Sequence, residues 1–237
     1  MKFIDIQSKI RLAKICKEHH FRKRGNAYFR TIGDGVLQII KIEYERVFSH
    51  FSLKFGLHSM YGAYQKFHFT SFGCITGHYI KNIIGEKTAV SVNHSGQYVS
   101  FGIETLEKQL DYLEDTAMDW LDSITTQNAL ADALCFLDNQ LDNSIIWNDS
   151  LKLVPYLQSR QYSNADKVIN HILYQHTREE LGTIPWSEED YETYTLHFPG
   201  RDLDFLQLHK WIYDNDETAI KAWLQNNYIQ NCANLHL

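Results

Sequence analysis

Hydrophobic and polar residues alternate along much of the chain between residues 27 and 57, and this alternation predicts β-strands. In residues 50–57 an apolar side chain stands at every second position, so we expect one face of this strand to be buried and the other to be solvated. Residues 36–44 also alternate and are rich in β-branched Ile and Val, which suit the pleated backbone. We therefore expect residues 36–44 to form a strand near the middle of a sheet.

A short glycine-containing segment separates two of the predicted strands. Gly33-Asp34-Gly35 lies between residues 27–32 and residues 36–44. Glycine adopts the positive φ values that tight hairpin loops require. The segment therefore predicts that the two flanking strands pair in antiparallel fashion. Residues 88–93 and 98–103 read as two further strands around a hairpin loop, and residues 59–85 read as loops with a short helix near residues 79–84.

Apolar residues at helical spacing predict one helix over residues 2–20 and a second over residues 105–121. The second helix carries an apolar stripe formed by Leu106, Leu110, Leu113, Ala117 and Leu121. Such a stripe is stable only when it is buried, and the apolar face of the sheet is the simplest partner. After about residue 126 the chain shows helical patterns only, in residues 128–141, 149–159, 163–176, 203–213 and 217–227.

These patterns predict an α+β fold, with an antiparallel β-meander of four to five strands flanked by two helices and followed by an all-helical C-terminal region. The change of pattern divides the chain into an α+β domain at residues 1–125 and a helical region at residues 126–237. Two successive helix pairs indicate a small helical array, without a convincing sequence repeat. The pattern leaves open whether this region is a separate domain or packs on the first core.

The segment FRKRGNAYFR at residues 21–30 is followed by GDGVLQII at residues 33–40. A basic tripeptide and Gly-Asn before an aromatic strand, then a Gly-Asp-Gly turn and a strand with Leu-Gln, resemble the opening of a bacterial family known as domain of unknown function 4304. The resemblance covers about the first half of the chain, and the tryptophan-rich strand of that family does not follow residues 74–85. Because the family has no established activity, the resemblance implies a fold and no functional residue.

The composition is typical of an ordered globular protein, with 44% hydrophobic residues and only 3 Pro. The sequence contains no apolar stretch of membrane-spanning length, and its first residues do not resemble a signal peptide, so we expect a cytoplasmic protein without a membrane partner. The cysteines form no Cys-x-x-Cys pair and are expected to be reduced core thiols; they are Cys16, Cys74, Cys135 and Cys232.

The sequence shows no recognisable catalytic, cofactor or metal signature. Its histidine pairs lack the i, i+4 spacing of chelating ligands, and it has no phosphate-binding glycine loop and no Gly-x-Ser-x-Gly nucleophile elbow. We therefore predict no metal, no cofactor and no catalytic residue. A missing motif does not rule out an enzyme. The alternative hypothesis is an enzyme or nucleic-acid-associated factor whose site is assembled from distant residues, around His94, Tyr98 or the loops of residues 59–85.

The first 30 residues are basic, with nine Lys and Arg against two acids. The run Arg22-Lys23-Arg24 lies near Tyr28 and Phe29, and such cations and aromatics together can bind the phosphates and bases of nucleic acid. The other interpretation is that these cations solvate the connection between a helix and a strand. A net charge of −6 for the whole chain favours that interpretation.

Residues 101–150 are acidic, with eleven acids and one base, Lys108. Glu107, Asp111, Asp115 and Asp119 follow one another at i, i+4 and are expected on one face of the helix at residues 105–121. This face is either simply solvated, or neutralised by the basic first helix, or a docking surface for a basic protein. We favour the hypothesis of a non-enzymatic binding protein that presents this face to a basic partner, as a toxin-neutralising immunity protein would.

Overall fold

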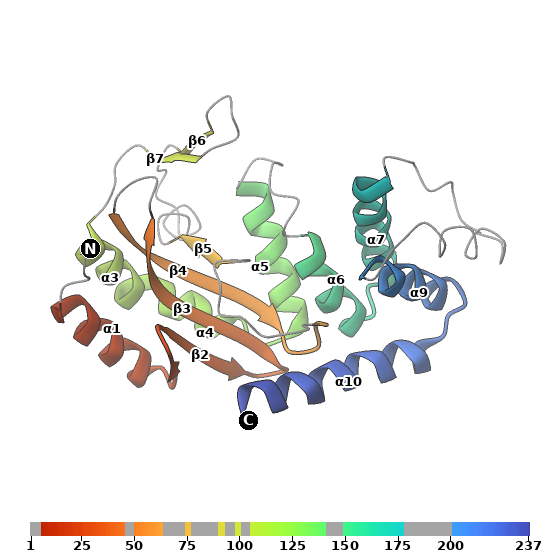
Figure 1. The fold of residues 1–237 in the computed structure, drawn as a ribbon, viewed down its shortest axis with the longest axis horizontal. Coiled ribbons are helices and arrows are strands. Elements are labelled where there is room, and N and C mark those ends of the chain that lie inside the picture. The colour runs from red at the N-terminus through yellow and green to blue at the C-terminus, as the bar shows by residue number, and fades with distance from the viewer. Residues whose placement is uncertain are drawn as a thin grey trace. The chain divides into compact units, whose positions relative to one another are not determined.

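The structure is a computed structural model that describes residues 6–45, 50–63, 74–76, 90–92, 98–100, 105–140, 149–177 and 201–237 (Figure 1). The chain divides into two compact units, and each unit is discontinuous in sequence. The first unit comprises Met1–His58 and His68–Ile146, and the second comprises Ser59–Phe67 and Trp147–Leu237. The division therefore lies beyond the boundary predicted at residue 125, because the helix after residue 126 belongs to the first unit.

The first unit contains a five-stranded sheet whose strands lie in chain order. The strands are β1 (Arg22–Arg24), β2 (Ala27–Ile32), β3 (Val36–Glu45), β4 (His50–Ser59) and β5 (Cys74–Thr76). β1 and β2, β2 and β3, and β4 and β5 pair in antiparallel fashion. The predicted α+β fold is confirmed, and β3 lies at the centre of the sheet as predicted.

The hairpin between β2 and β3 has the predicted glycine turn. Ile32 pairs with Val36, so Gly33-Asp34-Gly35 forms the loop. Gly33 has a φ of +51° and Gly35 a φ of +65°, in the left-handed region that glycine adopts without strain. The loop also contacts the segment between two helices, because the Asp34 N–H donates to the Thr125 carbonyl at 2.8 Å and Gln127 Nε2 donates to the Asp34 carbonyl at 2.5 Å.

β1 is a strand that the hydrophobic pattern does not predict. Its residues Arg22, Lys23 and Arg24 are all exposed, so it has no apolar alternation to reveal it. It is joined to β2 by Gly25-Asn26, and Gly25 has a φ of +60°, as glycine-first hairpin turns require. A short edge strand of cations also discourages pairing with another sheet.

Both faces of β3 are buried, and the face of β4 that was predicted to be solvated is covered toward its end, whereas Lys54 is only half-buried. On β4, Phe55 and Leu57 are buried on one face, and Gly56 and His58 are buried on the other. The polar positions of β3 follow the same rule, since Gln38 is completely buried and Lys41 is only 2% exposed. Covered polar residues of this kind need hydrogen-bond partners within the protein.

The helices of the first unit are α1 (Ile6–Glu18), α3 (Leu106–Tyr112), α4 (Met118–Ser123) and α5 (Gln127–Gln140), and the π-helical turn η1 (Leu113–Ala117) joins α3 to α4. The predicted helix at residues 105–121 is therefore present, with a wider turn in its middle. Thr105 is its N-cap, and the Thr105 hydroxyl accepts the Lys108 N–H. Of its predicted apolar stripe, Leu106 is half-buried and the other four residues are buried.

A second, two-stranded sheet pairs β6 (Val90–Val92) with β7 (Tyr98–Ser100) in antiparallel fashion, which confirms the predicted hairpin. β5 lies within the segment of residues 59–85 that the sequence predicts as loops. The short helix predicted near residues 79–84 lies outside the described residues.

The described residues of the second unit from Asp149 onward form helices and the turns between them. Its helices are α6 (Asp149–Gln158), α7 (Tyr162–Thr177), α9 (Arg201–Tyr213) and α10 (Glu217–Leu235). They form two hairpins, α6 with α7 and α9 with α10, around one hydrophobic core. The core includes Leu153, Leu157, Ala165, Ile169, Leu206, Leu208, Ile220 and Leu224.

The two hairpins of the second unit have the same turn. In the first, the Gln161 N–H donates to the Tyr156 carbonyl at 2.8 Å, and Arg160 has a φ of 58°. In the second, the Asp216 N–H donates to the Trp211 carbonyl at 2.8 Å, and Asn215 has a φ of 55°. Both are Schellman turns, which end a helix with one left-handed residue. The structure therefore reveals a repeated hairpin where the sequence showed no repeat.

The segment after β4 belongs to the second unit and is held by α10. Asn231, which is 1% exposed, donates from Nδ2 to the Met60 carbonyl at 2.7 Å and to the Gly62 carbonyl at 2.8 Å. The rings of Tyr61 and Tyr228 also lie against each other, with centroids 4.9 Å apart. This segment is therefore fixed by polar and aromatic contacts to a helix that is distant in sequence.

Candidate functional site

An arginine of α1 binds the predicted acidic face of α3. Arg11 Nη1 donates to Asp111 Oδ1 at 2.5 Å, and Arg11 Nη2 donates to Glu114 Oε2 at 2.6 Å. Arg11 Nε also donates to Glu114 Oε2, at 3.2 Å. The hydrogen bonds to Glu114 and Asp111 raise the pKa of Arg11. One of the interpretations of the acidic block, neutralisation by the basic first helix, is therefore correct for these two carboxylates.

The four carboxylates of the predicted partner-binding face are all exposed: Glu107, Asp111, Asp115 and Asp119. They do not follow a straight α-helical face, because η1 places a wider turn between Asp111 and Asp119. Asp111 is bound to Arg11, whereas no ion pair joins the other three to another described residue. The structure therefore leaves Glu107, Asp115 and Asp119 as the accessible acidic groups of this helix.

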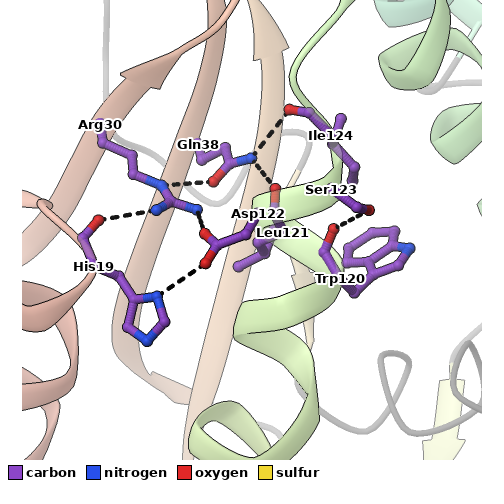
Figure 2. Close-up of polar contacts among 8 residues, drawn as sticks. All are labelled: His19, Arg30, Gln38, Trp120, Leu121, Asp122, Ser123 and Ile124. Carbon is purple, nitrogen blue, oxygen red and sulfur yellow. Dashed lines mark hydrogen bonds and ion pairs between the residues drawn. The ribbon is translucent and has the colours of Figure 1, made fainter.

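A second polar contact, shown in Figure 2, joins α4 to the sheet and to the end of α1. Arg30 of β2 binds Asp122 of α4 through Nη2, and the other oxygen of Asp122 lies 3.1 Å from His19 Nδ1. Arg30 Nη1 donates to the His19 carbonyl at 2.9 Å, and Arg30 Nε donates to Gln38 Oε1 at 2.9 Å. Every nitrogen of this guanidinium thus has an acceptor.

Gln38 extends this network into the backbone of α4. Its Nε2 donates to the Leu121 carbonyl at 2.6 Å, and the Ile124 carbonyl lies 3.4 Å away (Figure 2). Arg30 also stacks on Phe21, with its guanidinium carbon 4.4 Å from the ring centroid. Arg30 is only 8% exposed and is bound on each of its three nitrogens, which fixes it between the sheet, α4 and the end of α1.

His19 and Asp122 have the arrangement of a base and the carboxylate that orients it, and this pair is partly exposed. Nucleophilic catalysis would also require a hydroxyl or thiol within hydrogen-bond distance of the histidine ring. Within the described ranges, no Ser, Thr or Cys side chain donates to His19. The His19–Asp122 contact links the end of α1 to α4.

The basic run predicted as an alternative nucleic-acid site lies on the edge strand β1, where Arg22, Lys23 and Arg24 are exposed. Lys23 Nζ lies 5.9 Å from the Tyr28 ring centroid. However, Tyr28 and its neighbour Phe29 are both buried. The two aromatic side chains that were candidates for base stacking are therefore part of the core.

The described thiols and potential metal ligands do not form a reactive centre. Cys16 is completely buried, and burial raises the pKa of its thiol to about 12, so it is an inert core thiol. No group of three His, Cys, Asp or Glu side chains in the described ranges is placed to hold a metal ion. The side chains of Cys74 and Tyr98, and all of His94, lie outside what is described.

The second unit contains a buried histidine beside a partly exposed aspartate, a pair that the sequence does not indicate. Asp166 Oδ1 of α7 lies 3.3 Å from Nε2 of His209 on α9, and the His209 side chain is completely buried. Burial lowers the pKa of His209 and raises the pKa of Asp166, and the charge of each partner opposes the shift of the other. Asn170 Nδ2 donates to the other Asp166 oxygen at 3.2 Å, so the pair is anchored within α7.

Comparison of the chain with family models, with curated proteins and with solved structures finds no match. The resemblance to domain of unknown function 4304 therefore stays a prediction. Among the described helices, none has the length and apolar character needed to cross a bilayer.

Proposed function

We propose that this protein is a non-enzymatic binding protein that captures a basic protein through the outer face of α3 and α4. The single observation that carries this proposal is the binding of Arg11 by Asp111 and Glu114. It is an example, within the chain, of a guanidinium held by two carboxylates of this helix. A partner arginine or lysine would meet the same chemistry at the exposed Glu107, Asp115 and Asp119.

The charge of the helix also supports recognition of a cation. From Leu106 to Ser123 the only basic residue is Lys108, so the outer face is predominantly negative. An exposed negative surface accelerates encounter with a basic partner, and this effect is weakened by salt. A toxin-neutralising role, in which the protein covers a basic enzyme, is one biological setting for such binding.

The test is affinity capture of basic proteins from the native cytoplasm by the full chain, at low and at moderate salt. We expect Asp115→Lys with Asp119→Lys to abolish the capture of any partner that the wild type retains. The matched control is Asp132→Lys with Asp214→Lys, which changes the net charge equally at exposed positions on α5 and after α9. Equal retention by the wild type and the Asp115/Asp119 variant would refute the proposed surface.

We choose Asp115 and Asp119 rather than Asp111 for this test because Asp111 holds Arg11. A change at Asp111 would alter the contact between α1 and α3 and would confuse binding with folding. Circular dichroism and the urea midpoint of each variant establish that both variants are folded before capture is compared.

A further inference from the structure

The outer face of α1 carries two exposed isoleucines followed by two lysines. Ile6 is 71% exposed and Ile10 is 58% exposed, and because they are one helical turn apart they form a small contiguous apolar patch. The exposed residues Ile6, Ile10, Lys14 and Lys17 follow one another at spacings of four, four and three, so they lie on one face. The buried residues Leu12, Ile15 and Cys16 lie on the opposite side.

α1 lies beside the helix formed by α3, η1 and α4, and the two run in the same direction. Arg11 binds Asp111 and Glu114, whereas His19, directly after the last residue of α1, contacts Asp122 near the end of α4. The contact of α1 with α3 is visible in Figure 1. The cationic stripe of Lys14 and Lys17 on α1 therefore runs parallel to the anionic stripe of Asp115 and Asp119 on the adjacent helix.

We propose that this protein forms a two-fold symmetric dimer in which α1 of each copy lies on the α3–α4 face of the other. The two copies face each other across a two-fold axis that runs parallel to the helices. This axis places α1 of one copy opposite α3–α4 of the other, so each cationic stripe meets an anionic one. Lys14 and Lys17 then face the partner's Asp115 and Asp119. This inference rests on the proposed function because it uses the same acidic face; the occupant is the basic first helix of a second copy, although the whole chain has a net charge of −6.

The same arrangement removes the exposed isoleucines from water. Ile6 and Ile10 precede the lysines on the face of α1 that the partner covers, and their burial adds a favourable apolar contribution to the charge pairing. Arg11 remains bound within its own chain and keeps α1 in place. The existing contact between Lys14 and Glu18 is exposed and 3.9 Å long, so its replacement by an intermolecular pair costs little.

The test is the dimer dissociation constant of the full chain, measured by sedimentation equilibrium at two salt concentrations. We expect wild-type dimers that weaken as salt increases. Lys14→Glu with Lys17→Glu, and separately Asp115→Lys with Asp119→Lys, each place like charges opposite each other twice in a homodimer. Each variant is expected to raise the dissociation constant about tenfold or more.

The decisive measurement is an equimolar mixture of the two variants. In a mixed dimer the glutamates introduced on α1 of one variant meet the lysines introduced on the other, and the native carboxylates of the first variant meet the native lysines of the second. The heterodimer should therefore form more tightly than either variant homodimer. A wild type that is monomeric at all concentrations, or variants that stay monomeric when mixed, would overturn this inference. Recovery in the mixture also shows that both variants are folded.

The two proposals are separable by experiment. If the wild type is monomeric but the Asp115/Asp119 variant loses a captured basic protein, the dimer is refuted and the proposed function stands. If mixing restores the dimer, the second copy is established as an occupant of the acidic face, whether or not another protein is captured.

Discussion

The carbonyl oxygen of Thr125 lies 1.9 Å from the position that a β-carbon on Gly33 would occupy. The same oxygen accepts the N–H of Asp34 at 2.8 Å, so the β2–β3 loop and the connection from α4 to α5 approach each other as backbone on backbone. Neither side has a flexible side-chain end that can move away. Any larger residue at position 33 would therefore clash with the Thr125 backbone and would also adopt an unfavourable positive φ.

We predict that Gly33→Ala lowers the free energy of unfolding by about 2–4 kcal/mol, since a steric clash adds to the cost of a left-handed alanine. Gly25→Ala is the matched control, because Gly25 has a similar φ of +60° but no atom within 4 Å of the added carbon. It should cost only about 1 kcal/mol. Urea denaturation of both variants checks the difference, and equal costs would contradict the close approach.

Removal of the Asp122 carboxylate is predicted to destabilise the first unit by about 2–3 kcal/mol, because it leaves the buried Arg30 guanidinium without its counter-charge. This loss of stability is smaller than the loss expected for a fully buried ion pair, because the Asp122 side chain is 39% exposed. Asp119→Ala, on the same helix, removes an exposed carboxylate and should change stability by less than about 0.5 kcal/mol. Chemical denaturation of Asp122→Ala and Asp119→Ala compares the two.

Acid is predicted to destabilise the protein through His58. Burial lowers the pKa of His58 to about 4, whereas the unfolded chain has an ordinary histidine pKa near 6.5. Between these values the unfolded state binds the proton and the folded state does not, so stability is present above pH about 6.5 and is lost as the pH falls toward 4. The full loss corresponds to about 3 kcal/mol.

The check is the free energy of unfolding at several pH values between 7 and 4, for the wild type and for His58→Gln. The variant removes the proton-binding group, so its stability should fall less steeply with decreasing pH. His20→Asn is the control, because His20 is exposed and has a left-handed φ of 62° that asparagine tolerates. If the free energy of unfolding of His58→Gln falls with pH as steeply as that of the wild type, His58 is not the cause of the acid destabilisation.

Loss of the Asn231 side-chain amide is predicted to cost about 2–4 kcal/mol, because Asn231→Leu leaves the carbonyls of Met60 and Gly62 buried without a donor. Asn226→Leu introduces the same side chain at an exposed position of α10 and should be close to neutral. Thermal unfolding of the two variants provides the comparison, and similar melting temperatures would show that the double hydrogen bond contributes little.

The sheet and the helices could be predicted where side-chain pattern and backbone geometry depend on nearby residues. The alternation around β3 and the two glycines of its hairpin reflect local rules, and both are confirmed. The helix at residues 105–121 is likewise marked by its own stripe. β1 escaped prediction because three exposed cations have no alternation, and η1 escaped because a wider turn leaves the apolar spacing nearly unchanged.

The polar contacts could not be predicted, because each joins residues that are distant in sequence. Arg30 and Asp122 are 92 residues apart, and nothing near Arg30 distinguishes it from the exposed cations of β1. The polar positions of β4 were expected to face solvent. Alternation distinguishes the two faces of a strand, but it does not show whether another part of the chain covers the polar face. Of the predicted acidic face, the sequence identified the exposed carboxylates but not which of them Arg11 binds.

The placement of Ser59–Phe67 in the second unit also determines when the chain can complete its fold during synthesis. Gly62 leaves the ribosome 169 residues before Asn231, the residue that holds it. At ordinary translation speeds of 5–20 residues per second this is a delay of roughly 10–30 s. During that time the strands through β4 are already made, while the carbonyls of Met60 and Gly62 still lack the Asn231 amide that binds them.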